Sequence, residues 1–184
     1  MPQRAVPLAY TLILAASPAH SLEVSVIETD FEDGSYRVEL QAMLDAPADA
    51  VAAVLTDFAH YRDLDPRIRE SEVLATTDNG EVLLRTRLEV CAGYFCRTVE
   101  RVERVTRSRA SLMAEVVPGR SDLRRGLTQT RWRAEQARTR VQYTAEFDPD
   151  FWVPPFIGRR YALKVLRDAT LRLFANVEDR ARHL

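Results

Sequence analysis

The chain has 184 residues, which is enough for one domain with a buried core and too few for two domains of ordinary size. Its 26 basic and 27 acidic side chains nearly cancel, leaving a formal net charge of −1 at pH 7. The composition therefore predicts no basic surface and argues against nucleic acid as a partner.

The first 21 residues differ from the rest of the chain. They contain an apolar run, Ala5–Ala16, followed by small residues, and no acidic residue precedes Glu23. This layout predicts a secretory signal, with residues 22–184 as the exported domain, most simply in a bacterial periplasm. The apolar run is shorter than the roughly 20 residues that a membrane-spanning helix needs. A partly buried N-terminal strand or an uncleaved anchor is the alternative interpretation.

The next part of the chain predicts strands with one short helix between them. Residues 22–27 form a candidate strand, and residues 32–35 carry turn-forming Asp and Gly. Residues 36–44 alternate between apolar and polar side chains, as a half-buried strand does. A short helix is expected at residues 50–55, and residues 61–65 read as a further turn that ends before a proline.

A long run of strand candidates follows, separated by turn signals. Residues 81–90 alternate most regularly, with Leu88 among the side chains expected to point inward. Residues 97–107 place valines three apart, a spacing that suits a helix as well as a strand. We favour a strand, because the segment is rich in β-branched residues. The predicted strands are residues 68–77, 81–90, 97–107, 111–117, 123–134 and 138–147, joined as an antiparallel meander.

The C-terminal segment predicts one long helix, at about residues 157–180. It contains no Pro or Gly after Gly158, and its apolar residues recur at helical spacing. The stripe comprises Tyr161, Ala162, Val165, Leu166, Ala169, Leu173, Phe174, Val177 and Ala181. A stripe this wide must be covered. The sequence therefore predicts an α+β fold, in which a curved antiparallel sheet surrounds the long C-terminal helix and the space between them decides the function.

The two cysteines, Cys91 and Cys96, flank a four-residue segment that contains Gly93. In a hairpin they would lie opposite each other, at a separation that permits a disulfide. Free thiols are the alternative, whereas a redox motif or a zinc site lacks the required spacing or ligands. A disulfide agrees with export, since exported proteins meet an oxidising environment.

No catalytic constellation, metal-ligand set or cofactor motif is present in the sequence. His60 is interpreted as an ordinary, partly exposed histidine, although it could line a cavity mouth. By alternation, Arg85, Arg87 and Arg131 are expected on the outer face of the sheet; the alternative is that one of them faces inward and polarises a ligand carbonyl. Three aspartates are expected in helix caps or solvated turns, since their spacing lacks the glycine and terminal glutamate of a calcium loop: Asp57, Asp63 and Asp65.

Two stretches resemble the START-like (SRPBCC) superfamily. The first runs from Ala46 to Pro66 and contains Asp57-Phe58-Ala59-His60-Tyr61, similar to the family's opening of strand, proline, helix and D-[FY]-x-x-Y. The second is Phe151–Gly158, leading into the C-terminal helix. Across about residues 35–180 the chain most resembles the polyketide cyclase and coenzyme Q-binding branch. The resemblance implies the helix-grip fold of START and Bet v 1-like proteins, with a cavity for a hydrophobic molecule.

Aromatic and apolar side chains are the candidate ligand contacts. Phe151, Trp152 and Phe156 precede the long helix beside two prolines, and Tyr94 and Phe95 lie between the cysteines; all five are expected at a cavity rim. Leu88, Met113, Trp132 and Tyr143 are inward candidates. Ordinary core packing, or simple plugging of the end of the cavity, would explain these residues equally well.

The expected function is binding or transport of a lipid, isoprenoid quinone or polyketide-like molecule, with possible transient contact with a membrane surface. A cyclase or dehydrase acting in the same cavity is the alternative, and a structural or protein-binding role is a third. An enzyme requires convergent acid and base groups in the cavity, which the sequence does not reveal.

Overall fold

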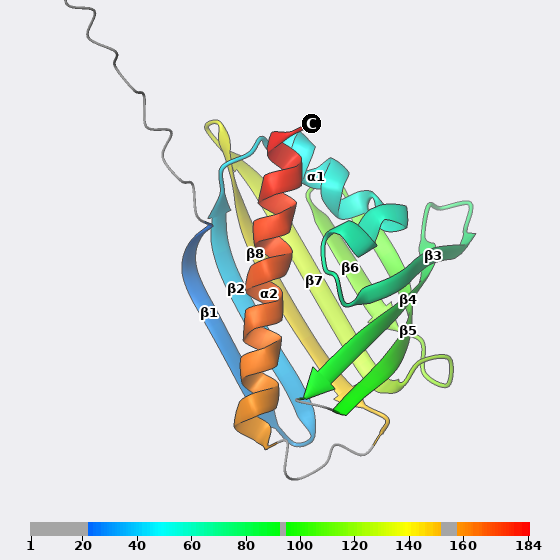
Figure 1. Cartoon of the computed structure of the whole chain (residues 1–184). Helices are drawn as coiled ribbons and strands as arrows, with labels where there is room; N and C mark the ends of the chain where they lie inside the picture. Colours follow the sequence, from blue (N-terminus) through cyan, green and yellow to red (C-terminus); the bar gives the residue numbers. More distant parts are fainter. Residues whose placement is uncertain (1–21, 93–94, 152–157) are drawn as a thin grey trace, which may run out of the picture.

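The computed structural model describes residues 22–92, 95–151 and 158–184, and no statement is made about the side chains of Ala92 and Phe95. The described part of the chain contains eight strands, two α-helices and one short 3-10 helix, η1 (Figure 1). In chain order they are β1 (Glu23–Glu32), β2 (Ser35–Leu44), α1 (Ala48–Thr56), η1 (Phe58–Asp63), β3 (Ile68–Thr76), β4 (Val82–Ala92), β5 (Phe95–Ser108), β6 (Ser111–Val116), β7 (Leu123–Glu135), β8 (Arg138–Pro149) and α2 (Arg159–Arg182).

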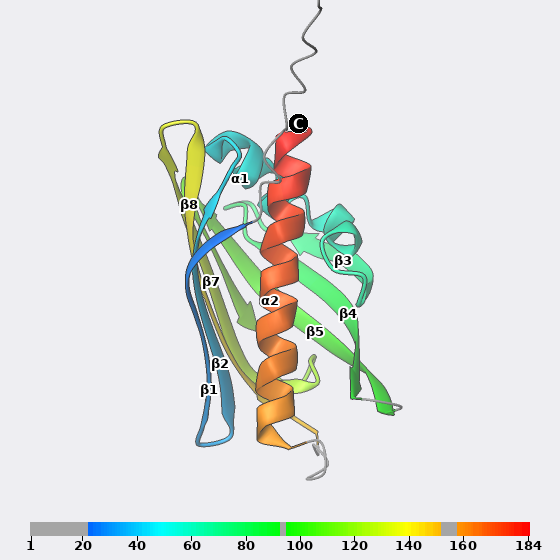
Figure 2. The ribbon, with the colours of Figure 1, turned by 60° about the vertical axis from the view of Figure 1, so that its left-hand side comes forward.

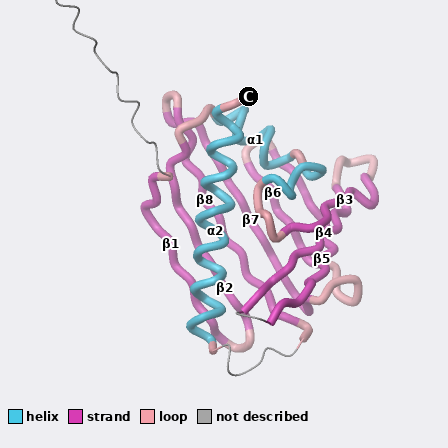
Figure 3. The backbone as a smooth tube through the Cα atoms, in the orientation of Figure 1, coloured by secondary structure: helices cyan, strands magenta, loops and turns pink. Residues whose placement is uncertain are grey.

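All eight strands form one sheet in the order β1-β2-β8-β7-β6-β5-β4-β3, and every neighbouring pair is antiparallel. The sheet curves around α2, which lies along its concave side (Figures 1 and 2). The helices α1 and η1 cover one end of the same side, next to the C-terminus (Figure 3). The predicted α+β, helix-grip architecture is therefore confirmed.

Two sequence-predicted boundaries differ from the structure, by five residues at the end of the first strand and by two at the start of the long helix. The first strand extends beyond residue 27 to Glu32, because it pairs with β2 along its whole length up to the Glu32–Ser35 register pair. The tight turn between these strands uses Asp33 and Gly34, both with positive φ. The long helix begins at Arg159 rather than residue 157, since Gly158 adopts φ 65° and ψ 138° and is not helical.

The strand interpretation of residues 97–107 is confirmed, but the spacing of its valines does not define one face. Val99 and Val105 lie on the concave side, whereas Val102 lies on the opposite side of β5. Val102 is nevertheless buried, and its backbone N–H donates to Ser121 Oγ at 2.9 Å, from the segment between β6 and β7. A spacing of three therefore reflects burial on both faces of this strand.

A solid core fills the end of the grip that lies beside α1. Phe174 and Val177 of α2 are fully buried there against residues of β2, α1 and β8 such as Leu44, Val51 and Val141. Thr139 Oγ1 donates to the backbone oxygen of Ala46 at 2.7 Å, and the Asn176 side chain donates to Leu64 O at 2.8 Å. These bonds fasten the connections around α1 and η1 to the sheet and to α2.

Candidate ligand-binding cavity

A cavity of about 560 Å³ lies between α2 and the concave face of the sheet. Its sheet side is formed mainly by inward-facing residues of β4 to β8, with Tyr36 of β2 and Ile68 of β3, and its helix side by one face of α2 from Tyr161 to Phe174. The helix contributes Tyr161, Ala162, Val165, Leu166, Ala169, Thr170, Leu173 and Phe174. A volume of this size is typical of sites that enclose a small organic molecule.

Gly126 in β7, which borders the cavity, leaves room for the side chain of Val116 on the neighbouring strand β6. A Cβ atom at this position would lie 2.7 Å from Val116 Cγ2, a separation that real side chains do not show. Glycine therefore lets Val116 of β6 pack over β7 at this point of the cavity wall.

Three of the residues predicted from the sequence line the cavity: Leu88 on β4, Tyr143 on β8 and Phe151 just after β8. Trp132 points to the same side of the sheet but is only 5% exposed and packs in the solid core instead. Tyr94, Trp152 and Phe156 fall outside the described residues, as does the side chain of Phe95.

The expectation that Met113 faces inward is wrong. Its side chain is 40% exposed on the outer face of the sheet, while Leu112 and Ala114 on either side of it line the cavity. Successive side chains in a strand point to opposite faces, so Met113 must face outward if Leu112 and Ala114 face the cavity. The pairing of β6 with β5 and β7 sets that register.

Aromatic side chains gather at the end of the cavity near the start of α2. Tyr36 stacks on Phe147 with a ring-centroid separation of 5.7 Å and touches Phe31 at 4.6 Å. The guanidinium group of Arg159 lies 4.5 Å from the centre of the Phe31 ring, and that of Arg97 lies 4.3 Å from the centre of Phe151. Burial raises the pKa of Tyr36, so its hydroxyl stays protonated at neutral pH.

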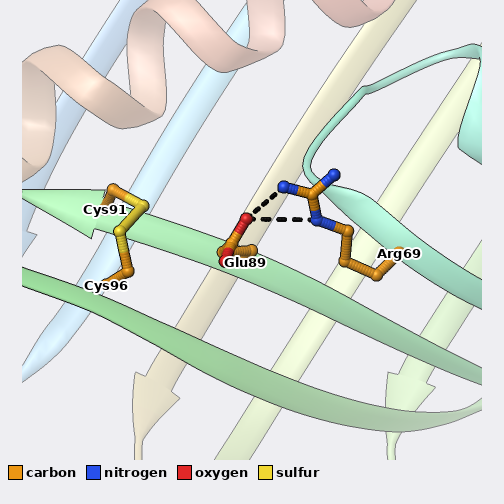
Figure 4. The surroundings of a disulfide bond; sticks show 4 residues. All are labelled: Arg69, Glu89, Cys91 and Cys96. Carbon is orange, nitrogen blue, oxygen red and sulfur yellow. Dashed lines mark hydrogen bonds and ion pairs between the residues drawn. A yellow bond between two sulfur atoms is a disulfide. The ribbon is translucent and has the colours of Figure 1, made fainter.

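The predicted disulfide between Cys91 and Cys96 is present (Figure 4). The two residues are direct register partners on β4 and β5, with a Cα–Cα separation of 4.0 Å. Cys91 also contributes to the cavity lining. Next to the disulfide, Arg69 Nε donates to Glu89 Oε2 at 3.1 Å and ties β3 to β4.

Sequence reasoning missed a charged pair inside the cavity. Arg101 and Glu103 of β5 both point inward, and Arg101 Nη2 donates to the two carboxylate oxygens of Glu103 at 2.7 and 2.6 Å. Glu103 is only 4% exposed. The signal was available: alternation counted from Val99 places residues 101, 103 and 105 on one face. The valines three apart concealed it.

Two tyrosines lie near this pair. The Tyr61 hydroxyl donates to Leu55 O at 2.7 Å, and the Tyr143 ring packs edge-on against Phe174 at 5.2 Å. Burial raises the pKa of both phenols; the Glu103 charge adds to this effect and the Arg101 charge opposes it. Both phenols are therefore neutral at physiological pH.

Residues 35–178 match the sequence profile of a family described as polyketide cyclase / dehydrase and lipid transport. The match spans most of the 184-residue chain. The chain belongs to this family. No curated protein sequence matches it significantly.

Solved structures share the fold of this family member at low sequence identity. A protein from Thermus thermophilus superposes with a TM-score of 0.67 at 17% identity, covering 80% of this chain and 97% of its own. The Zhui aromatase/cyclase from Streptomyces gives 0.63 at 19% identity, covering 81% and 95%. A STAR-related lipid transfer protein from Xanthomonas axonopodis gives 0.61 at 17% identity, covering 85% and 98%.

Several polar side chains singled out from the sequence lie outside the cavity, most of them in ion pairs or hydrogen bonds. The His60 side chain is 60% exposed and its Nδ1 lies 2.8 Å from Asp57 Oδ1. Asp63 accepts from Arg180 Nη1 at 3.0 Å. Arg85 and Arg87 lie on the outer face of the sheet, as predicted, in ion pairs with acidic residues of β3 and β5, and Arg131 is exposed there.

Asp65 differs from the other two aspartates because it borders the cavity and is buried. Its Oδ1 accepts from the backbone N–H and Nε of Arg67 at 3.0 and 2.9 Å. Burial alone would raise the Asp65 pKa, but the hydrogen bonds from Arg67 outweigh it and lower the pKa. Within the described ranges, His, Cys, Asp and Glu side chains form no cluster of three or more that could hold a metal ion. The helices described there include none long and apolar enough to cross a membrane.

Proposed function

We propose that this protein binds a small hydrophobic molecule in the cavity between α2 and the sheet and carries it in solution. The observation that supports this most is the cavity itself, about 560 Å³ in volume and lined mainly by aliphatic and aromatic side chains. Membership of a family that includes lipid transport agrees with this role. Lipids, isoprenoid quinones and polyketide-like molecules are the ligand classes considered.

A cyclase or dehydrase in the same cavity is the second candidate, favoured by the polar groups of Arg101, Glu103, Tyr61 and Tyr143. General acid–base catalysis needs a group with a pKa near the working pH that is free to exchange a proton. Both Glu103 oxygens accept from Arg101, and burial raises the pKa of both tyrosines away from neutrality. These groups are better suited to holding a ligand than to moving its protons, so we place binding first.

We further propose that the domain is exported to the periplasm after removal of residues 1–21. The signal-like composition of this segment, which lies outside the described residues, and the Cys91–Cys96 disulfide support export. Ligand exchange would then involve transient contact with a membrane surface and no nucleic acid. N-terminal sequencing of protein purified from the periplasmic fraction tests this proposal. A chain that begins at residue 1 would contradict it.

Two neighbouring residues of β6 provide a matched test of the carrier proposal. Ala114 faces the cavity and Met113 faces solvent, so Ala114→Trp fills the cavity whereas Met113→Trp adds the same ring outside it. We expect the first variant to lose binding of a fluorescent lipid and the second to retain it, with circular dichroism as the check on folding. Val165→Trp, from the helix side of the cavity, replaces Ala114→Trp if that variant does not fold. Equal binding by folded cavity and surface variants would contradict the proposal.

The aromatic residues before α2 provide a test of the rim. Trp152, which lies outside the described residues, is proposed to cover one end of the cavity beside Phe151. Trp152→Ala should weaken lipid or quinone binding while leaving the thermal unfolding curve nearly unchanged. Native mass spectrometry of protein from its own envelope fraction would identify the molecule that co-purifies.

A further inference from the structure

The inward face of the β4–β5 hairpin changes character along its length. Moving along the hairpin from the disulfide, Val90 faces Arg97, and the next inward pair, Leu88 and Val99, is apolar. The next pair is Thr86–Arg101, and the pair after it joins Leu84 to Glu103. A polar zone therefore lies some five residues, or about 17 Å of strand, beyond Cys91, and the apolar Leu88–Val99 pair separates it from Arg97 beside the disulfide.

This zone contains hydrogen-bonding capacity that no described residue uses. Arg101 Nη2 is occupied by Glu103, but Arg101 Nε and Thr86 Oγ1 are buried without a hydrogen-bond partner in the described part of the chain. Thr86 is only 4% exposed, whereas 31% of the Arg101 side chain is accessible and borders the cavity. These two atoms lie beneath the cavity surface, and Arg85 Nε on the outer face is buried without a partner as well, so the unpaired atoms alone do not define a site. The hydrogen bonds of Arg101 in the described part of the chain both leave from Nη2, so the accessible part of its guanidinium group keeps donor capacity for a ligand in the cavity.

A second ion pair on the cavity wall, Asp65–Arg67, differs from the Arg101–Glu103 pair in its hydrogen bonding. Asp65 and Arg67 are joined by hydrogen bonds from the backbone N–H, Nε and Nη2 of Arg67. Neither residue has a buried polar atom without a partner in the described chain. This pair is complete as it stands, whereas the zone around Arg101 is not.

The charges in the zone select the kind of ligand group. Arg101 and Glu103 neutralise each other, so a carboxylate beside them would bring a second, uncompensated negative charge into a buried site. The neutral phenols of Tyr61 and Tyr143 add no charge that would offset it. A neutral acceptor, such as a carbonyl oxygen, receives hydrogen bonds from the guanidinium group without this penalty.

We propose that Arg101, supported by Thr86 and Glu103, forms a subsite for a neutral carbonyl group at the end of an otherwise apolar ligand, such as an ester, ketone or quinone, bound with this end innermost. The subsite rests on the proposed carrier function and defines its ligand class. Arg101 donates to the carbonyl oxygen, and Glu103 makes the site select against anions.

A competition experiment with three matched ligands tests the subsite. The neutral fluorescent probe N-phenyl-1-naphthylamine is bound to the protein and displaced by methyl dodecanoate, dodecanoate or dodecane at pH 7. We expect the ester to bind about tenfold more tightly than the anion, in keeping with one hydrogen bond to a charged donor. Dodecane should bind more weakly than the ester but still displace the probe.

Variants of Arg101 and Glu103 then show which of the two residues causes the preference for the ester over the anion. Glu103→Gln should improve dodecanoate binding about tenfold and remove or reverse the preference for the ester, because the Arg101 charge is no longer balanced. Arg101→Met should abolish the advantage of the ester over dodecane. If Arg101→Met does not fold, Arg101→Lys, which keeps the charge but loses the planar group, should reduce that advantage.

Glu100→Gln is the matched control. Glu100 lies on the same strand and also pairs with an arginine, with Arg87 Nε donating at 2.7 Å, but it does not line the cavity. We expect it to leave the order of the three ligands unchanged. Equal binding of ester and anion by the wild-type protein, or the same shift in both glutamate variants, would overturn the subsite while leaving the carrier proposal intact. If none of the ligands displaces the probe and the probe itself does not bind, the carrier proposal fails as well.

Discussion

The two halves of α2 face different surroundings although they share one apolar stripe. In the C-terminal half, Val177 and Ala181 are at most 2% exposed and pack on the sheet and α1, and the fully buried Phe174 lies at the boundary, where it joins the core and also touches the cavity. In the N-terminal half, Val165 and Leu166 are only partly buried and Tyr161 is 43% exposed, and all three border the cavity. The same helix therefore closes a solid core at one end and covers a hollow at the other.

This difference shows that stability and ligand binding depend on separate parts of the grip. The C-terminal half of α2 holds the helix on the sheet, so the N-terminal half need not be filled for the domain to fold. The apolar burial in the C-terminal half offsets the free-energy cost of leaving apolar side chains uncovered in the N-terminal half. A ligand that binds in the cavity would stabilise the folded state further. Variants that change one half and leave the other unchanged test this division.

The largest effect is expected from truncation in the packed half. Phe174→Ala should lower the free energy of unfolding by about 3–5 kcal/mol, because it removes a fully buried ring that also contacts Tyr143. Both of these residues touch the cavity, so Val177→Ala, at a fully buried position that does not line it, is the accompanying variant confined to the packed half. Leu166→Ala in the cavity half should cost about 1 kcal/mol or less, since this side chain is already only partly buried. Urea denaturation monitored by circular dichroism measures all three. Similar losses in Phe174→Ala and Leu166→Ala would show that the halves are not distinct.

An intermediate effect is expected from the disulfide at the cavity end of the β4–β5 hairpin. Cys91→Ser combined with Cys96→Ser should lower the free energy of unfolding by about 2 kcal/mol, the value expected for so short a closed loop. The loss should be accompanied by faster amide hydrogen exchange in β4 and β5 near Cys91, with little change in α1 or the second half of α2. Uniform acceleration across the domain would indicate that the disulfide supports the whole fold rather than the cavity end.

The smallest effect is expected from a surface carboxylate remote from the cavity. Hydrogen bonds from Arg140, and then from Arg133, lower the pKa of Glu135 to about 2 from its ordinary value of 4.5. A depressed folded-state pKa stabilises the protein above the unfolded pKa, and this contribution is lost as the pH falls from about 4.5 through about 2. The melting temperatures of wild type and Glu135→Gln should therefore differ slightly at pH 6 and converge near pH 2. Ligand binding should be unaffected, because Glu135 does not line the cavity.

Much of the fold could be predicted from local patterns. The alternation in residues 81–90, the Asp33-Gly34 turn and the stripe of the long helix each follow from side-chain periodicity or backbone preference, and the structure contains all three. The Cys91–Cys96 pair was predictable for the same reason, since a short turn fixes which residues oppose each other. The facing of β6 was also predictable, because Leu112, Ala114 and Val116 alternate with Ser111, Met113 and Glu115; Met113 was assigned to the wrong face because it was judged by its side-chain type rather than by its neighbours.

The sequence by itself determined the order of elements, the antiparallel sheet, the disulfide and one long helix with an apolar face. Only the tertiary structure decided where that face meets the sheet and where it meets a cavity, because the stripe is equally apolar along its whole length. Alternation along β5 places Arg101 and Glu103 on the same face as Val99, but only the tertiary structure shows that this face borders a cavity. Periodicity describes one element at a time, whereas a binding site arises from the distance between elements.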